Sequence, residues 1–182
     1  MIIEATPLNG VLIVRSPVYR DTRGFFTEVF HASRFANLGL PTAFVQDNFS
    51  HSRKNILRGL HYQVGTPQGK LVRATHGAIF DVAVDLRRSS STFGQWYGMT
   101  LSAGDGCQLW VPEGCAHGFL VLSDHADVSY KCTELYDPAA ERTIRWDDAD
   151  LGIEWPCPSG GPPELSAKDA EAASFATAPT YE

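Results

Sequence analysis

A histidine, an arginine and a lysine lie close together in the middle of the chain. The run Arg58-Gly-Leu-His61-Tyr-Gln places a cation, a flexible glycine and a titratable imidazole side by side, and Lys70 follows across a turn. An imidazole takes up and releases a proton near neutral pH. A lone histidine is more often a hydrogen-bonded structural residue than a catalyst, but the neighbouring cations Lys70 and Arg73 strengthen the catalytic interpretation of His61.

The segment around His117 has the most specific spacing. Gly106, Pro112, Gly114 and His117 are separated by five, one and two residues, which matches the second half of the cupin pattern. Cupins are small jelly-roll barrels, and the first half of their pattern supplies a His-x-His pair and a carboxylate as metal ligands. This chain has His61-Tyr-Gln instead. Because tight transition-metal binding needs three or four well-placed ligands, we expect neither a metal nor another cofactor.

Two tyrosines are candidates for roles in a cavity. Tyr130 shares a strand face with Val128 and Cys132. A buried phenol usually finds a hydrogen-bond partner, so Tyr130 is either a core residue with a satisfied hydroxyl or a general acid inside the cavity. Tyr136 lies before a proline, at a strand end or turn, where its ring could stack on a flat ligand or shield the core.

Apolar and polar residues alternate along several segments, which is the signature of strands. The alternation covers residues 25–30, 44–50, 80–86 and 127–133. Turn sequences at 21–24, 65–69, 102–106 and 112–114 separate such runs. Many short strands at close spacing predict an all-β jelly roll, sandwich or small barrel.

Polar side chains share strand faces with large apolar ones. Glu28 shares a face with Phe26, and Gln46 and Asn48 share another. Such faces either meet solvent or together line the polar pocket of a barrel. On a further strand Asp81 and Asp85 alternate with valines, and for this pair a structural role in the barrel is favoured over support of a site.

Helical patterns are scarce. One short helix is predicted over Ala32–Leu38, with Ser33 as a possible cap and Gly39 as its stop. Another is predicted over Lys168–Ser174, with Ser166 near its start. Residues 156–163 form a Pro/Gly-rich connector, and residues 176–182 are predicted to be a loose tail or arm. Residues 1–182 are expected to form one domain with an N-terminal strand arm and a C-terminal helical and tail segment.

Composition limits the classes of partner. The 182 residues include 15 Lys and Arg and 21 Asp and Glu, for a net charge of −6. This balance argues against non-specific nucleic-acid binding, although a few arginines can still gather around a small anion. No apolar run approaches the roughly 20 residues of a membrane span. The start lacks the sections of a signal peptide, and the four cysteines form no CxxC pair, so we expect reduced thiols and a cytoplasmic location.

Seven landmarks in order give the chain its resemblance to a known family. They are residues 21–28, 44–48, 57–63, 68–73, 80–87, 112–119 and 165–169. Over nearly its whole length the chain resembles the dTDP-4-dehydrorhamnose 3,5-epimerases. The resemblance implies a metal-free cupin jelly roll with a few short helices. It also implies a homodimer in which strands cross between subunits.

The resemblance also implies a reaction. The substrate would be dTDP-4-dehydro-6-deoxy-D-glucose, and the carbons on both sides of its ketone, 3 and 5, would be inverted in dTDP-L-rhamnose synthesis. By position, His61 matches the base, Asp169 the carboxylate that orients it, Tyr130 the acid on the opposite sugar face, and Lys70 the cation at the enolate oxygen. Removal of a proton next to a ketone needs a base and a stabilised enolate, which these residue types supply.

Further positions match substrate contacts of the family. They are Arg23, Phe26, Glu28, Gln46, Asn48, Arg58, His117, Tyr136, Glu141 and Lys168. Arginines suit a diphosphate because the guanidinium group meets phosphate oxygens in pairs, and Tyr136 matches the aromatic residue that stacks on thymine.

Three other functions stay open from the sequence. One is a relative that inverts carbon 3 only, in an antibiotic or modified-sugar pathway. Another is a sugar-nucleotide binding module without catalysis, which the joint presence of His61, Asp169, Lys70 and Tyr130 disfavours. The last is a metal-dependent cupin oxygenase, which the absent His-x-His pair disfavours.

Overall fold

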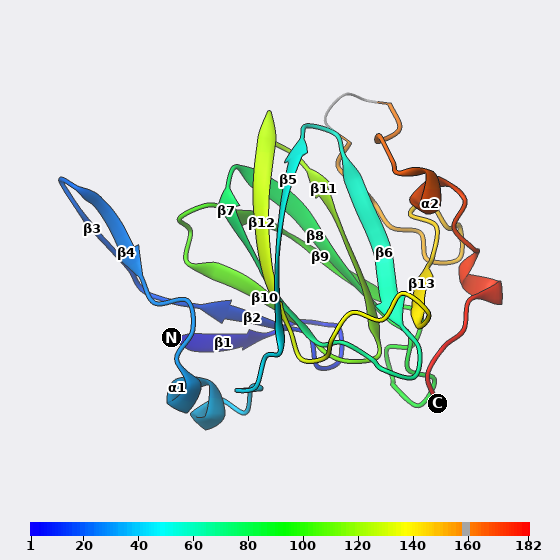
Figure 1. Cartoon of the computed structure of the whole chain (residues 1–182), viewed down its shortest axis with the longest axis horizontal. Coiled ribbons are helices and arrows are strands. Elements are labelled where there is room, and N and C mark those ends of the chain that lie inside the picture. The colour runs from blue at the N-terminus through cyan, green and yellow to red at the C-terminus, as the bar shows by residue number, and fades with distance from the viewer. Residues whose placement is uncertain (158–160) are drawn as a thin grey trace.

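Two β-sheets face each other in a jelly roll (Figure 1). The structure, a computed structural model, describes residues 1–157 and 161–182, so the predicted connector over 156–163 lies in part outside the described residues. The larger sheet has the order β1 (Ile2–Ala5), β2 (Leu12–Arg15), β10 (Cys107–Val111), β7 (Lys70–His76), β12 (His125–Cys132) and β5 (Gln46–Arg53). The smaller has β13 (Glu141–Thr143), β6 (Leu57–Gln63), β11 (Cys115–Val121), β8 (Ala78–Asp85) and β9 (Trp96–Ser102). The predicted all-β jelly roll is confirmed.

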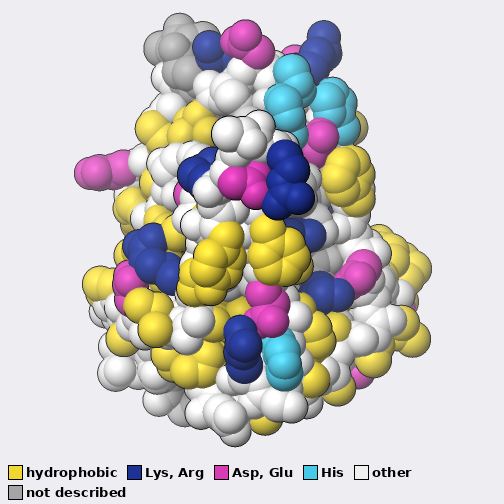
Figure 2. All heavy atoms as spheres, turned by 90° about the vertical axis from the view of Figure 1, so that its left-hand side faces the viewer, with side chains coloured by type: hydrophobic (Ala, Val, Ile, Leu, Met, Phe, Trp, Pro, Cys, Tyr) yellow, Lys and Arg dark blue, Asp and Glu magenta, His cyan; other side chains and the backbone are white. Residues whose placement is uncertain are grey.

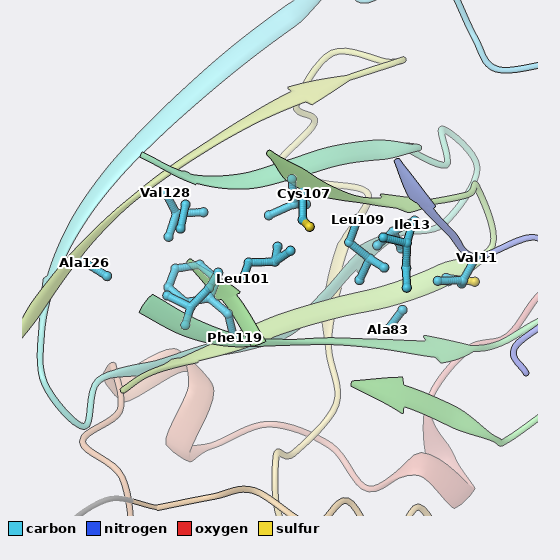
Figure 3. Close-up of a cluster of buried hydrophobic side chains, with 14 of the residues drawn as sticks. Val11, Ile13, Ala83, Leu101, Cys107, Leu109, Phe119, Ala126 and Val128 are labelled. Atoms are coloured by element: carbon cyan, nitrogen blue, oxygen red, sulfur yellow. The ribbon is translucent and has the colours of Figure 1, made fainter. Parts of the chain in front are cut away.

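The main core lies between the two sheets. Side chains from both sheets point toward one another there, among them Ile13 and Leu109 from the larger sheet and Leu101 and Phe119 from the smaller (Figure 3). Alternation along each strand places every second residue in this layer. On β8 the layer receives Ile79 and Ala83, so the two aspartates of that strand point into the barrel.

The outer face of the smaller sheet is covered by the C-terminal segment. Val82 and Val84 of β8 pack there in a second cluster with Ala178. The Tyr62 hydroxyl of β6 donates to the Pro179 carbonyl over 2.8 Å, and the Tyr181 hydroxyl donates to the Gln63 carbonyl. The prediction of a loose tail over 176–182 is therefore wrong, because apolar burial and these hydrogen bonds attach the segment to β6.

The two predicted helices exist but differ from the prediction at their ends. The helix α1 (Ala32–Asn37) starts after His31, which makes no side-chain cap bond, so Ser33 is not its cap. The helix α2 (Ala167–Ala170) is capped by Ser166, the residue that the sequence places near its start, but the helix ends well before Ser174. The chain leaves α2 because Ala173 pairs with Ile144 in a β-bridge. A short 3-10 helix, η1 (Phe175–Thr177), follows.

A two-stranded arm extends from the body of the molecule. Its strands are β3 (Val18–Asp21) and β4 (Gly24–Thr27), joined at the predicted turn. Figure 1 shows the arm reaching past the edge of both sheets. The predicted alternation over residues 25–30 fails beyond Thr27, where β4 ends and the chain turns toward α1. No helix in the described residues is long and apolar enough to cross a membrane.

A buried ion pair joins β8 to the following loop. Asp85 is fully buried, and its carboxylate accepts two hydrogen bonds from the Arg87 guanidinium and one from the Thr92 hydroxyl over 2.7 to 2.8 Å. Burial alone would raise the pKa of Asp85, but these donors lower it to about 2. Both oxygens are satisfied, which is the arrangement of a structural carboxylate.

Replacing Asp85 with asparagine is expected to lower the free energy of unfolding at neutral pH by about 3 kcal/mol, because Arg87 loses a buried partner. In the folded protein the pKa of Asp85 lies below the ordinary value of 3.8 for an aspartate. The stabilisation by ionised Asp85 is therefore complete above pH 3.8 and is lost as the pH falls toward about 2. Urea denaturation of the wild type and the variant should show that their free energies of unfolding differ less at about pH 3 than at neutral pH. Asp147→Asn, at an exposed pair with Arg145, is the control and should cost less than about 1 kcal/mol.

Candidate active site

A polar pocket of about 340 Å³ opens between the two sheets. Residues from both sheets and from the loop before β13 line it. They are Gln46, Asn48, Ser50, Arg58, His61, Tyr62, Gln63, Gln68, Lys70, His117, Phe119, Tyr130, Tyr136 and Glu141. Nine of the residues predicted from the sequence therefore lie around one cavity.

A histidine–carboxylate pair lies at the β6 wall of the pocket. His61 Nε2 is 2.7 Å from Asp169 Oδ1, and the Asp169 side chain is only 3% exposed. Asp169 belongs to the first turn of α2, where its backbone N–H donates to the Ser166 hydroxyl. Burial alone would raise the pKa of Asp169, but the hydrogen bond and charge of His61 and the Ser166 hydroxyl hold it below its ordinary value. The ionised carboxylate leaves His61 Nδ1 as the nitrogen that can exchange a proton with a ligand.

An irregularity in β6 brings Arg58 and His61 to the same side. Opposite β11, His61 pairs with His117 and Arg58 with Phe119, so three steps along β6 match two steps along β11. Such a bulge inserts one residue and reverses the alternation beyond it. Gly59 permits it, since a Cβ there would lie 2.5 Å from the Cα of Gly118. Arg58 then spans the pocket to donate to the Ser52 hydroxyl of β5 over 3.0 Å.

Lys70 lies buried at the floor of the pocket. Its ammonium donates to the His61 carbonyl over 3.2 Å, which ties β7 to β6 across the two sheets. Burial lowers the pKa of Lys70, against the opposing effect of nearby acidic groups. The cation therefore lies next to His61 in a desolvated site, where a charge acts most strongly on a nearby oxyanion.

Tyr130 lies on the wall opposite His61. It projects from β12 of the larger sheet, on the face shared with Val128 and Cys132 as predicted, and it packs at the edge of the main core. Burial, with a smaller contribution from Cys132, raises the pKa of Tyr130. The phenol therefore stays protonated at neutral pH and can act only as a proton donor until it has lost its proton.

A network of polar side chains closes the outer side of the pocket. The Tyr136 backbone N–H donates to Gln46 Oε1 over 2.7 Å, and its hydroxyl donates to Glu141 Oε2 over 2.9 Å. Lys168 of α2 pairs with the other oxygen of Glu141 at 2.8 Å. Burial would raise the pKa of Glu141, but Lys168 and Tyr136 lower it. Asn48, beside Gln46, accepts from its amide over 3.0 Å.

The sequence interpretation missed several residues of the pocket. Gln63 follows His61 by two positions, and its side chain donates to the Leu135 carbonyl and accepts from the Asp137 N–H, which holds the loop of Tyr136. Alternation from His61 could have found it, as alternation from His117 could have found Phe119. Gln68 donates to the Glu134 carbonyl over 2.8 Å, and nothing in its local sequence pattern marks it.

Four predicted contact residues are not among those that line this chain's own pocket. One is Lys168, which reaches the pocket only through Glu141. Arg23 and Phe26 belong to the arm, where Arg23 pairs with Asp21 and Phe26 is 67% exposed. Glu28 follows β4 and pairs with Arg34 of α1 at 2.7 Å. Within residues 1–157 and 161–182, no three His, Cys, Asp or Glu side chains are grouped so that they could hold a metal ion.

Comparison with known proteins reveals the family of this chain. The family model described as dTDP-4-dehydrorhamnose 3,5-epimerase matches residues 5–177. A curated relative of that name from Salmonella typhimurium is 53% identical over 174 residues, which are 94% of each chain. The chain belongs to the dTDP-4-dehydrorhamnose 3,5-epimerase family. Its activity class is therefore isomerase, and the predicted family membership is confirmed.

Solved structures of epimerases share the fold over nearly the whole chain. A dTDP-6-deoxy-D-glucose-3,5-epimerase from Legionella pneumophila, in complex with dTDP-4-keto-L-rhamnose, superposes with a TM-score of 0.92 at 48% identity and covers 97% of this chain and 93% of its own. A 3'-monoepimerase from Streptomyces bikiniensis, in complex with dTDP-quinovose, gives 0.86 at 33% identity over 94% of this chain and 87% of its own. By both identity and TM-score, this member of the epimerase family is more similar to the Legionella pneumophila 3,5-epimerase than to the Streptomyces bikiniensis monoepimerase.

Replacing Asp169 with asparagine is expected to lower kcat/KM about 10²- to 10⁴-fold, because a neutral amide cannot stabilise the His61 imidazolium. KM should change little, since Asp169 lies behind His61. Steady-state epimerisation assays check both values. The matched control, Asp147→Asn, removes an exposed carboxylate that does not line the pocket and should keep full activity. A variant at position 169 with more than about a tenth of wild-type kcat/KM would contradict the role of the pair.

Proposed function

We propose that this epimerase inverts carbons 3 and 5 of dTDP-4-dehydro-6-deoxy-D-glucose to give dTDP-4-dehydro-L-rhamnose. One observation carries the proposal: His61 on β6 and Tyr130 on β12 line opposite walls of the same pocket. Inversion requires that a proton leave one face of a carbon and return to the other. A base and an acid on facing sheets are placed for this task, and Lys70 lies beside the base.

The proposed chemistry starts at a carbon next to the C4 ketone. His61 Nδ1 takes the proton from carbon 3, the C–H electrons form a C3–C4 double bond, and the carbonyl oxygen becomes an enolate. The Lys70 ammonium stabilises this oxygen. The enolate electrons then take the Tyr130 hydroxyl proton on the opposite face, and the ketone re-forms. Exchange with solvent returns the proton to Tyr130 and removes it from His61, and the same sequence at carbon 5 completes the reaction.

The nucleotide end of the substrate needs cations and an aromatic surface. Arg58 and Tyr136 lie at the pocket, and the Tyr136 ring is half exposed, so a thymine can stack on it. The Arg58 guanidinium suits the diphosphate. The carbon-3-only reaction stays as the second candidate, because the monoepimerase of Streptomyces bikiniensis shares the fold.

We further propose that the enzyme is a homodimer in which each arm completes the pocket of the partner. Tyr19, Phe25 and Phe26 of the arm are all more than half exposed, and Figure 2 shows hydrophobic side chains on the face that carries the arm. β5 lies at the edge of the larger sheet, and its Gln46 and Asn48 line the pocket. An exposed strand edge and an exposed aromatic surface are features that a second copy can cover. An arm beside β5 would bring Arg23 and Phe26 to the pocket.

A cytoplasmic location stays a proposal as well. Its support is that all four cysteines are free, three of them buried.

Proton NMR of the substrate in deuterated buffer tests the reaction. Deuterium is expected at both carbon 3 and carbon 5 with the wild-type enzyme, and incorporation should fall at least about 100-fold with His61→Ala. Tyr130→Phe should still exchange deuterium, because His61 can return a solvent-derived proton to the same face, while net inversion falls at least about 100-fold.

Each remaining result of this experiment selects another function. Exchange at carbon 3 alone would favour the monoepimerase. Absence of exchange with retained binding of the sugar nucleotide would favour a non-catalytic module. Exchange by His61→Ala at the wild-type rate would contradict the assignment of the base.

Subunit mixing tests the proposed dimer. A protomer with Arg23→Ala and Phe26→Ala and a protomer with His61→Ala are each expected to be inactive alone. Their heterodimer, purified through two different tags, should regain about half of the wild-type activity, because one of its two sites combines an intact arm with an intact His61. A heterodimer as inactive as its parents would show that each arm serves its own subunit, and a monomer in solution would exclude the dimer.

A further inference from the structure

Glutamine side chains attach the loop that carries Tyr136 to the body of the molecule. The loop, residues 134–137, lies between the end of β12 and the start of β13. Within residues 1–157 and 161–182, the backbone groups of residues 134–136 make no hydrogen bond to another backbone group. A loop without strand pairing of its own depends on side-chain contacts for its position.

Gln63 makes hydrogen bonds on both sides of Tyr136. Its Nε2 donates to the Leu135 carbonyl over 3.1 Å, and its Oε1 accepts from the Asp137 N–H over 2.9 Å. A carbonyl only accepts and a backbone N–H only donates, so these two partners fix the orientation of the amide. Nε2 also donates to the Thr66 carbonyl over 2.8 Å. Both N–H groups of this buried amide are thus used within the protein.

Two further glutamines complete the attachment of the loop. Gln46 Oε1, from β5, accepts from the Tyr136 N–H over 2.7 Å. Gln68, in the connection between β6 and β7, is also buried and donates to the Glu134 carbonyl over 2.8 Å. Each residue of the loop therefore has a backbone group bonded to one of three side-chain amides, and amides carry no titratable charge.

Gln63 links the loop to the part of the pocket that holds His61. It lies two residues after His61 on β6 and is the strand partner of Glu141 on β13. The Glu141 carboxylate accepts from the Tyr136 hydroxyl over 2.9 Å. Both the backbone and the hydroxyl of Tyr136 are thus held relative to the strand of His61. A ligand that packs on this ring does not have to order the loop first, which is preorganisation.

We propose that Gln63 is a positioning residue for nucleotide recognition: its amide holds the Tyr136 ring in place for the base of the substrate. The inference rests on the proposed function, in which the base stacks on Tyr136. Gln63 acts through the loop and takes no part in proton transfer. Its loss should therefore weaken binding of the nucleotide and leave the chemical step nearly unchanged.

Gln63→Met keeps the approximate length of the side chain and removes its hydrogen bonds to the loop. Affinity for dTDP, measured by isothermal titration calorimetry, is expected to fall about 10- to 30-fold, because the loop must then be ordered on binding. KM should rise by a similar factor, whereas kcat should change less than about threefold. A fall in kcat with unchanged affinity for dTDP would overturn the inference.

Tyr181→Phe is the matched control. It removes the hydrogen bond that the Tyr181 hydroxyl donates to the backbone carbonyl of the same Gln63, but it leaves the amide and the loop untouched. It should lower stability and change the affinity for dTDP less than about twofold. If Tyr181→Phe weakens dTDP binding as much as Gln63→Met does, the effect belongs to β6 as a whole and the inference is wrong.

A double-mutant cycle tests whether Gln63 acts through Tyr136. The ring is absent in Tyr136→Ala, so adding Gln63→Met should weaken dTDP binding by less than about a further twofold. Additive losses would show that Gln63 supports binding by another route and would contradict the inference.

Amide hydrogen exchange in the free protein separates this inference from the proposed reaction. The Tyr136 N–H, which is bonded to Gln46, should exchange at least about tenfold faster in Gln63→Met, whereas the amides of β8 should change less. Unchanged exchange at Tyr136 would overturn the inference even if the enzyme inverts both carbons. Faster exchange together with weaker dTDP binding would support it even if the proposed reaction is wrong.

Gln63→Glu supplies the same measurements if Gln63→Met does not fold. At mildly alkaline pH its ionised carboxylate can accept from the Asp137 N–H but cannot donate to the Leu135 carbonyl. Exchange at Tyr136 should again rise and the affinity for dTDP should fall. Wild-type values of both would overturn the inference.

Discussion

The close contact between Gly59 and Gly118 is the constraint on which the rest of the site depends. A side chain on either glycine would collide with the backbone of the neighbouring strand, because an ideal Cβ lies 2.5 Å from the Cα of Gly118 in one case and 2.8 Å from the Arg58 carbonyl in the other. The two strands can therefore approach and shift register at this point only if both residues lack a Cβ. The shift brings Arg58 to the side of His61 and leaves His61 opposite His117.

The pocket also depends on the distance between the two sheets, because its walls belong to different sheets. His61 comes from the smaller sheet and Tyr130 from the larger, so their spacing is set by the layer of core side chains that holds the sheets apart (Figure 3). Lys70 and Arg58 cross this gap, the first to a carbonyl of β6 and the second to a hydroxyl of β5. The same contacts that hold these two cations at the pocket thus also join its two walls.

Local sequence patterns predicted much of the fold and the parts of the site that follow strand alternation. Tyr130 lies on the face expected from its strand, and His117 lies where the glycine and proline spacing placed it. Alternation could not have placed Arg58 beside His61, because a bulge cannot be seen in a pattern of period two. Residues 176–182 were predicted to be a loose tail because their order comes from contacts with β6 more than 100 positions earlier in the chain. The pairing of His61 with Asp169 spans 108 positions, so only the resemblance to a family could connect them.

The attachment of the C-terminal segment to β6 has a consequence for synthesis of the chain on the ribosome. Residues 164–181 are translated after the strands of both sheets, and they supply Asp169 to His61, Lys168 to Glu141 and Tyr181 to Gln63. The barrel can collapse around its core before these residues emerge, but His61 then lacks its carboxylate and β6 lacks its outer cover. A nascent chain therefore holds a pocket without the His61–Asp169 pair, and the pair forms only once the end of the chain has left the ribosome.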